Sequence, residues 1–179
     1  MQIYKLFHQN SGRRKIRYND FNTPMIIGNS EKVFGLKVEP EHYREFLDGI
    51  SNLLIKNKIS QHIMTDFKFT ELIRQSCKLG YELSDITFFN EERYLDDEVI
   101  QEVKNALWQS DIDLVLGSLL EAIDNGHNIL SITGDIQNIN GDLEQMKIYS
   151  NGTISVSSKQ RVERYPIIDF IIEGPEVIL

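Results

Sequence analysis

The spacing of apolar residues predicts two amphipathic helices in the first half of the chain. The clearer one follows Pro40, a residue suited to the first helical turn. Its apolar residues are Tyr43, Phe46, Leu47, Ile50, Leu53 and Leu54. The second helix has Thr65 or Asp66 as its N-cap, and Gly80 is expected to end it in the left-handed conformation. Cys77 falls on the apolar side of this helix and is therefore expected to be buried.

Two further helices are predicted between residues 96 and 126. Asp96 is expected to open the third, and Trp108 is expected to cover its end. The fourth takes Ser110 as its N-cap and stops at Gly126. Its expected buried residues are Ile112, Val115, Leu116, Leu119, Leu120 and Ile123.

Shorter apolar or alternating runs predict β-strands. They span residues 2–9, 15–18, 25–27, 33–38, 84–89, 129–136, 144–149, 153–157 and 165–172. The last run is almost continuously apolar, which fits a strand covered on both faces.

A tight turn is predicted between residues 149 and 153. A two-residue turn at Asn151-Gly152 would mix apolar and polar side chains on each face of the hairpin. A three-residue turn instead pairs Ile148 with Ile154 and Met146 with Val156, which keeps one face apolar. We therefore favour the three-residue turn, with Gly152 at the position that requires positive φ.

The order of these elements predicts the fold class. Strands come first, two pairs of helices follow with one strand between them, and strands close the chain, which indicates an α+β fold with a mostly antiparallel sheet. About four helices are expected to pack against the sheet, with a C-terminal β-meander. The length of 179 residues indicates a single globular domain over 1–179, with an N-terminal β sub-lobe over 1–38 as an alternative.

Composition indicates a folded cytoplasmic protein. The chain is 41% hydrophobic and 26% charged, which is ordinary for a globular domain. Its single cysteine cannot form an internal disulfide. The first residues do not follow the pattern of a signal peptide, and no apolar run approaches the length of a membrane span.

The formal net charge of −8 is unevenly distributed along the chain. Residues 1–19 carry five bases and no acid, whereas residues 82–144 carry fifteen acids and two bases. Such asymmetry suggests surfaces that select charged partners. The expected site for an anionic partner comprises Arg13, Arg14, Lys15 and Arg17. The expected acidic surface includes Glu91, Glu92, Asp96, Asp97, Glu98 and Glu102.

The sequence contains none of the common catalytic motifs. Its four histidines lack metal-binding spacing, and there is no phosphate-binding glycine loop or nucleophile elbow. We therefore expect no metal and no cofactor. If the protein is an enzyme, the best alternative is a hydrolase or nuclease whose carboxylates come from separate segments. The candidates, near strand ends, are Asp135, Asp142 and Glu144.

These observations favour a non-catalytic cytoplasmic interaction protein that acts through charged surfaces. Inhibitor or immunity-type proteins and small subunits of bacterial or phage defence complexes fit this description. The expected partner is another protein or a second copy of the chain, with no membrane. A nucleic-acid-binding subunit that uses residues 13–17 is a less favoured alternative, because the sequence pI is near 5.0.

Overall fold

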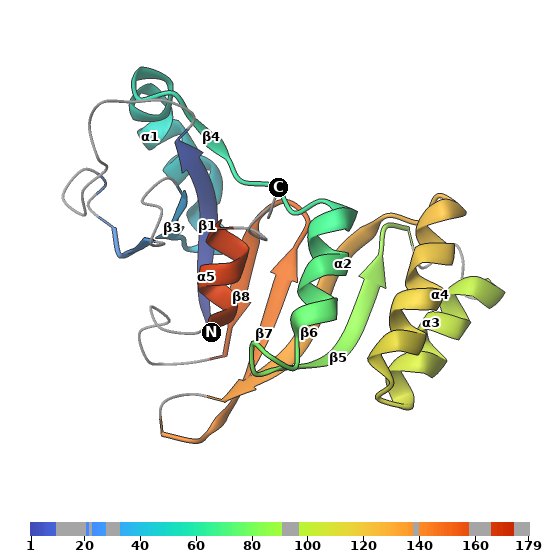
Figure 1. Cartoon of the computed structure of the whole chain (residues 1–179). Helices are drawn as coiled ribbons and strands as arrows, with labels where there is room; N and C mark the ends of the chain where they lie inside the picture. The colour runs from blue at the N-terminus through green and yellow to red at the C-terminus, as the bar shows by residue number, and fades with distance from the viewer. Residues whose placement is uncertain are drawn as a thin grey trace, which may run out of the picture. The chain divides into compact units, whose positions relative to one another are not determined.

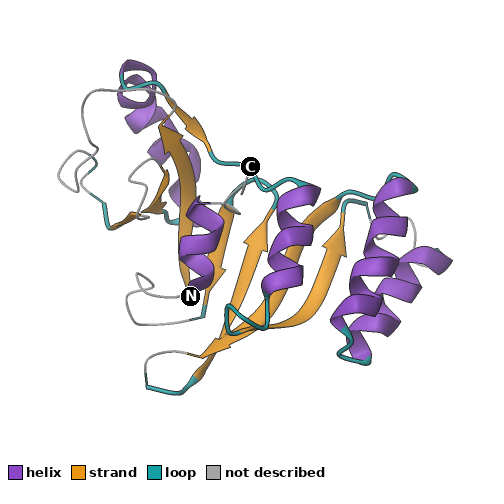
Figure 2. Cartoon of the chain, viewed as in Figure 1, coloured by secondary structure: helices purple, strands orange, loops and turns teal. Residues whose placement is uncertain are grey.

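The computed structural model describes residues 1–9, 21, 23–27, 33–90, 97–137, 140–157 and 166–173. These residues form an α+β fold of antiparallel strands and five α-helices, which confirms the predicted class (Figures 1 and 2). The helices are α1 (Tyr43–Lys56), α2 (Asp66–Gln75), α3 (Glu98–Trp108), α4 (Ile112–Asp124) and α5 (Pro166–Glu173). The strands are β1 (Gln2–Gln9), β2 (Met25–Ile27), β3 (Val33–Lys37), β4 (Ile59–Gln61), β5 (Tyr81–Phe88), β6 (Ile129–Gln137), β7 (Leu143–Tyr149) and β8 (Thr153–Val156).

The chain divides into two compact units. Unit 1 comprises Met1–Ile63 and Asn151–Leu179, and unit 2 comprises Met64–Ser150. The sub-lobe considered for residues 1–38 therefore falls within unit 1. The expectation of one domain over the whole chain stays a prediction, and the strand expected at 15–18 lies outside the described residues.

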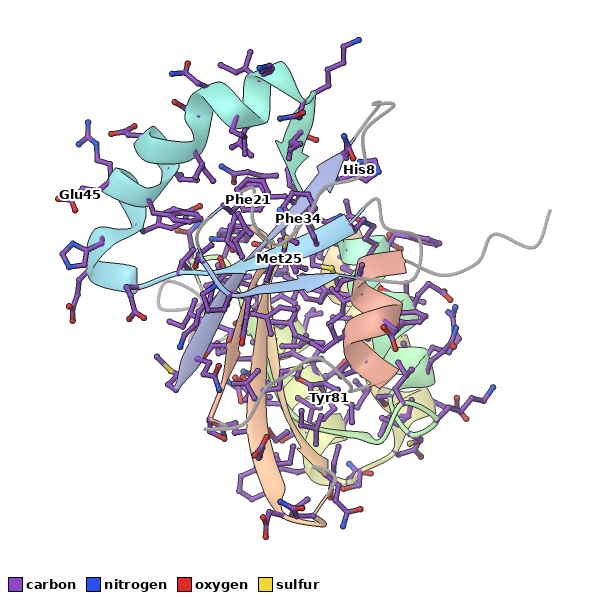
Figure 3. All side chains as sticks on the ribbon, turned by 90° about the vertical axis from the view of Figure 1, so that its left-hand side faces the viewer. His8, Phe21, Met25, Phe34, Glu45 and Tyr81 are labelled. Carbon is purple, nitrogen blue, oxygen red and sulfur yellow. The ribbon has the colours of Figure 1, made fainter. Side chains whose placement is uncertain are left out.

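Strand β1 is the centre of unit 1. It pairs antiparallel with β3 through residues 4–8, with β8 through residues 2–5 and with β4 through residues 7–9. Helices α1 and α5 lie on opposite sides of these strands (Figures 1 and 3). Successive side chains of a strand point to opposite faces. Because α1 and α5 cover the two faces, all four residues from 4 to 7 are buried.

An aromatic cluster lies between the strands of unit 1 and α1. Phe34 stacks on Phe7 with 5.8 Å between ring centroids, and Phe21 lies 5.5 Å from Phe34 on a tilted plane (Figure 3). Helix α1 contributes the partly buried Phe46, Leu47, Ile50, Leu53 and Leu54. These are apolar positions predicted for the helix from its spacing, so that prediction is confirmed.

The strand predicted for residues 165–172 is wrong, because residues 166–173 form helix α5. Its four buried isoleucines are Ile167, Ile168, Ile171 and Ile172. They recur at i, i+1, i+4 and i+5, which places them on one side of a helix. Pro166 at the first helical position also fits a helix start. A short, nearly continuous apolar run does not distinguish a buried strand from a buried helix.

The turn before β8 contains the glycine expected to need positive φ. Gly152 has φ +76°, as predicted. Its carbonyl accepts a hydrogen bond from the Leu6 amide at 2.9 Å, and the His62 amide donates to the Leu6 carbonyl at 3.0 Å. A β-carbon at residue 152 would overlap the His62 carbonyl. The turn therefore requires glycine for its backbone conformation and for the close approach of residue 62.

Unit 2 is built on the antiparallel strands β5, β6 and β7, which give the meander-like arrangement expected for the later part of the chain. Helix α2 lies across one face of these strands (Figure 1). Tyr81 is 1% exposed, and its ring occupies the space that a side chain at Gly134 would fill. Its hydroxyl donates to the Met146 carbonyl at 3.1 Å. Burial raises the pKa of the Tyr81 phenol well above its ordinary value.

Helix α2 starts as predicted, but it ends at Gln75, with Ser76 as its C-cap, before the predicted stop at Gly80. The Thr65 hydroxyl accepts a hydrogen bond from the Lys68 amide, as an N-cap should. After the helix, Gly80 has φ +64°, and the amides of Gly80 and Tyr81 donate to the carbonyls of Cys77 and Ser76. This hydrogen-bond pair has the pattern of a Schellman motif, but it closes the turn of residues 76–80 that follows α2. The burial predicted for Cys77 is wrong: the thiol is exposed.

Helices α3 and α4 begin one residue later than predicted. Asp97 caps α3 through the amides of Val99 and Ile100, and Asp111 caps α4 in the same way. Ser110, the predicted cap, lies before Asp111 with φ +54°. A carboxylate at the N-cap accepts hydrogen bonds from the free amides of the first turn, and its negative charge complements the helix dipole.

Four apolar side chains of this helix pair are less buried than expected. Trp108 does not cover the end of α3 but is 91% exposed, and Leu120 is 47% exposed. Ile112 and Ile123 are only partly buried. The buried residues of α4 are Val115, Leu116, Leu119 and Ala122. They follow one another at helical spacing, and Leu120 falls just outside that stripe.

Candidate functional site

Helices α3 and α4 form an acidic surface on unit 2. They pack side by side (Figure 2), and residues 97–125 contain seven acids and one base, Lys104. The Lys104 ammonium donates to Asp85 Oδ1 at 2.8 Å and to the Ile86 carbonyl at 2.5 Å. Burial alone would raise the pKa of Asp85, but the hydrogen bond and charge of Lys104 outweigh it and lower that pKa. The one base of this segment is therefore engaged by β5.

Apolar side chains are exposed on the same helix pair. Leu114 is 42% exposed, Leu120 is 47% exposed, and Gly117 between them leaves open space above the helix. These three positions are spaced i, i+3 and i+6, so they form a stripe on the outer side of α4. Trp108 stands at the end of α3, three residues before the Asp111 cap. We call α3, α4 and these side chains the α3–α4 surface.

A hollow of about 380 Å³ lies where α3 begins and α4 ends. Two of the residues that line it are in contact: His127 Nε2 lies 3.2 Å from Asp97 Oδ2, and the His127 side chain is only 10% exposed. The other oxygen of Asp97, Oδ1, accepts hydrogen bonds from the amides of Val99 and Ile100 in α3. The edge of the His127 ring meets Phe88, with 6.2 Å between centroids and 70° between planes. Capping and packing therefore hold both members of the pair in place.

Backbone hydrogen bonds fix the ends of the helix and strand beside this hollow. The amides of Gly126 and His127 donate to the carbonyls of Ile123 and Ala122, which makes a second Schellman motif, with Gly126 at φ +89° as predicted. The Phe89 amide donates to the Asn128 carbonyl at 3.0 Å. These bonds give the hollow a rigid wall at the end of α4.

The structure does not gather the three candidate carboxylates. Asp135 lies opposite Glu82 and Gln145 in the strand register, whereas Glu144 lies opposite Ile136. Neighbouring residues of a strand point to opposite faces, so Asp135 and Glu144 face opposite sides of the sheet. Asp142 is exposed and precedes β7. Their catalytic role stays a hypothesis.

The predicted charged surfaces are described only in part. Arg13, Arg14, Lys15 and Arg17 lie outside the described residues, and so do Glu91, Glu92 and Asp96. Glu98 and Glu102 are exposed on α3. Asp97 differs from them, because it is partly buried and binds His127. The His127–Asp97 pair could not be predicted from the sequence, because thirty residues separate its members. One signal was available in the sequence: Asp97 lies at the start of α3, and His127 directly follows Gly126, the glycine that ends α4.

Within the described part of the chain, no group of three or more His, Cys, Asp or Glu side chains is placed to hold a metal ion. Nor does any helix there combine the length and apolarity needed to cross a membrane. Comparisons of the chain with protein-family models, with curated proteins and with solved structures found no match.

Unit 1 contains a buried lysine. Lys5 of β1 is 1% exposed, and its ammonium donates to the Asn151 carbonyl in the turn before β8. Burial lowers the pKa of Lys5 from 10.5 to about 8. Below pH 8 the lysine is protonated in both the folded and the unfolded chain. The folded state then carries the full cost of burying the charge, about 3 kcal/mol.

We predict that Lys5→Met stabilises the protein at pH 7 by about 2 kcal/mol. This value allows about 1 kcal/mol for the hydrogen bond lost by the Asn151 carbonyl. Between pH 8 and 10.5 the folded protein releases the Lys5 proton while the unfolded chain keeps it, so wild-type stability rises relative to the variant. Urea unfolding of both proteins from pH 7 to 10 measures the difference. A gap that stays constant with pH would contradict the buried charge.

Proposed function

We propose that this protein is a non-catalytic interaction protein of the cytoplasm whose α3–α4 surface binds a cationic segment of a partner protein. Inhibitor or immunity-type proteins and small subunits of bacterial or phage defence complexes fit this description. The observation that carries the proposal is an exposed tryptophan on a helix pair whose single base is already engaged.

Charge supports a cationic partner. Six acids besides Asp97 lie in residues 97–125, and Lys104 is held by Asp85. Like charges that are close together raise one another's electrostatic energy, and a cationic partner removes that cost. Such a surface also speeds the encounter with its partner at low salt.

Exposed apolar groups support a protein partner over free cations. Tryptophan is enriched among the residues that dominate the binding energy of protein interfaces. Trp108 is 91% exposed, and such exposure of a large apolar side chain to water is unusual. Leu114 and Leu120 add an apolar stripe on α4. A segment that pairs basic residues with apolar ones satisfies both features. Residues 11–18 of a second copy of the chain have this composition, so self-association is one form of the proposal.

Fluorescence offers a direct test, because Trp108 is the single tryptophan of the chain. We expect a synthetic peptide of residues 11–18 to shift the Trp108 emission to shorter wavelength and to protect it from acrylamide. The effect should weaken between about 0.05 M and 0.5 M salt, because screening shortens the Debye length severalfold. A peptide with glutamine in place of the four bases is the control.

Matched variants locate the contact. Leu114→Asn with Leu120→Asn, and separately Asp113→Asn with Glu121→Gln, should each weaken peptide binding by about tenfold or more. Glu39→Gln with Glu41→Gln, which changes exposed acids of unit 1, should leave binding unchanged. Sedimentation velocity at the same two salt concentrations reports self-association. If neither the peptide nor a second copy binds at low salt, the proposal is wrong. Equal binding of the glutamine peptide would also contradict it.

A further inference from the structure

Helix α2 carries an exposed aromatic side chain and exposed cations beside the acidic helix α4. The two helices belong to unit 2 and pack against each other (Figure 1). Phe67 is 66% exposed, Arg74 is exposed seven residues further along α2, and Lys78 is exposed in the turn that follows the helix. A spacing of seven residues returns to the same side of a helix, so Phe67 and Arg74 share one outward face.

Resting on the proposed function, we infer that the cationic segment bound by the α3–α4 surface is helix α2 of a second copy of the chain. A two-fold axis beside the neighbouring helices α2 and α4 places α2 of each copy on α4 of the other. Every contact of this arrangement occurs twice, so each copy contributes both a cationic and an acidic helix.

Opposite charges favour this contact. Residues 111–124 contain four acids and no base, whereas residues 66–78 contain three bases and two acids. The two acids are engaged within unit 2: Asp66 accepts a hydrogen bond from a backbone amide at 2.9 Å, and Glu71 is paired with Arg74. The Arg74 side chain is still 51% exposed. Because a guanidinium has five N–H donors, Arg74 can bind a second carboxylate without releasing the first.

Exposed apolar side chains on the two helices also fit each other. Leu114 and Leu120 are 42% and 47% exposed on α4, and Gly117 lies between them. A β-carbon at Gly117 would meet no atom of the described residues within 4 Å, so the helix surface has a shallow depression there. The Phe67 ring can pack into this depression against both leucines. Removal of this apolar area from water stabilises the complex.

The spacing of charged and apolar residues agrees between the two helices. Phe67 and Arg74 are seven residues apart on α2, and Leu120 and Asp113 are seven residues apart on α4. Both separations correspond to about 10.5 Å along the helix axis. An antiparallel pairing of α2 with α4 of a second copy therefore brings the ring to Leu120 and the guanidinium to Asp113 at the same time. Asp113 is exposed, as this contact requires.

A second copy accounts for more of the exposed surface than an unrelated partner does. The exposed apolar side chains of α2 and α4 lie on neighbouring helices, and a reciprocal contact covers both sets. A foreign cationic segment on α4 would leave Phe67 exposed to water. The antiparallel pairing also carries Lys78 toward the start of α4, near Trp108, and a lysine ammonium over an indole ring is a favourable contact.

Sedimentation velocity of the full chain, up to about 0.3 mM and at about 0.05 M and 0.5 M salt, tests this dimer. We expect association whose dissociation constant rises with salt. Arg74→Glu and Asp113→Arg should each raise that constant by about tenfold or more, because each brings like charges together at both contacts. The variant with both substitutions again has opposite charges across the two-fold axis. Its dissociation constant should return to within about threefold of the wild-type value.

Matched controls change exposed residues of unit 1. Phe67→Ala should weaken association by about tenfold. Ile55→Ala removes an apolar side chain that is 77% exposed on α1, and Lys56→Glu reverses an exposed cation of the same helix. Both controls should leave association unchanged. Thermal melts confirm that all variants are folded.

The outcomes distinguish α2 from other cationic segments. A monomer at both salt concentrations, or no restoration in the double variant, would overturn the inference. Association that is lost in Asp113→Arg but kept in Arg74→Glu would overturn the choice of α2, while the α3–α4 surface remains the binding site. Loss in an Arg13→Glu/Arg14→Glu variant alone would assign the contact to residues 11–18 instead. The proposed function fails separately, when neither a cationic peptide nor a second copy binds.

Discussion

Leu119→Ala is expected to destabilise the protein by about 2–5 kcal/mol, the largest effect of any single change considered for this chain. Leu119 of α4 is 0% exposed and belongs to the stripe that the helix buries. Truncation removes the transfer free energy of its methyl and methylene groups and leaves a cavity, which close-packed neighbours fill only in part. Urea unfolding measures the change in the free energy of unfolding.

The adjacent leucine is the control for this prediction. Leu120 has the same size and helix but is 47% exposed, so Leu120→Ala should change stability by less than about 1 kcal/mol. A pair of equal effects would mean that α4 is rotated relative to its partners. A small effect at Leu119 would mean that this helix is not part of the core of unit 2.

Gly152→Ala is expected to cost about 2–4 kcal/mol. Part of the cost, about 1–2 kcal/mol, comes from placing an alanine at φ +76°. The rest comes from the overlap of the new β-carbon with the His62 carbonyl. That carbonyl is backbone, so relief requires the segment before residue 63 to move away from β1. The loss can be measured by urea unfolding.

Gly141→Ala separates the two contributions. Gly141 has φ +89°, and the nearest atom to a new β-carbon is the Gln137 side-chain nitrogen at 3.7 Å. Its substitution should therefore cost the backbone term alone, about 1–2 kcal/mol. Equal losses at residues 141 and 152 would show that the contact with His62 is not rigid.

Local patterns explain why most elements of the fold could be predicted. The apolar spacing of α1, the Thr65 cap and the stop of α4 at Gly126 are properties of neighbouring residues, and the structure has them. Residues 166–173 could not be assigned in this way, because a strand and a helix both bury a short run of isoleucine. The choice between a strand and a helix depends on what these residues pack against, and the sequence alone does not show that.

The candidate site was harder to predict for a related reason. Exposure of Trp108 and Leu120 depends on which face of each helix meets its neighbour, and a rotation of a few tens of degrees changes it. The His127–Asp97 pair depends on bringing two helix ends together. The charge asymmetry was visible in the sequence, but the engagement of Lys104 by Asp85 was not.

The discontinuity of unit 1 has a consequence for synthesis on the ribosome. Residues 2–5 of β1 pair with residues 153–156 of β8, whereas unit 2 is a continuous segment between them. At about 5–20 residues per second, β1 emerges roughly ten seconds before its partner. Unit 2 can complete its sheet in that interval, whereas the edge of β1 that later pairs with β8 stays unpaired. An unpaired edge invites pairing with another nascent chain, so chaperone demand should concentrate on the N-terminal strand during translation.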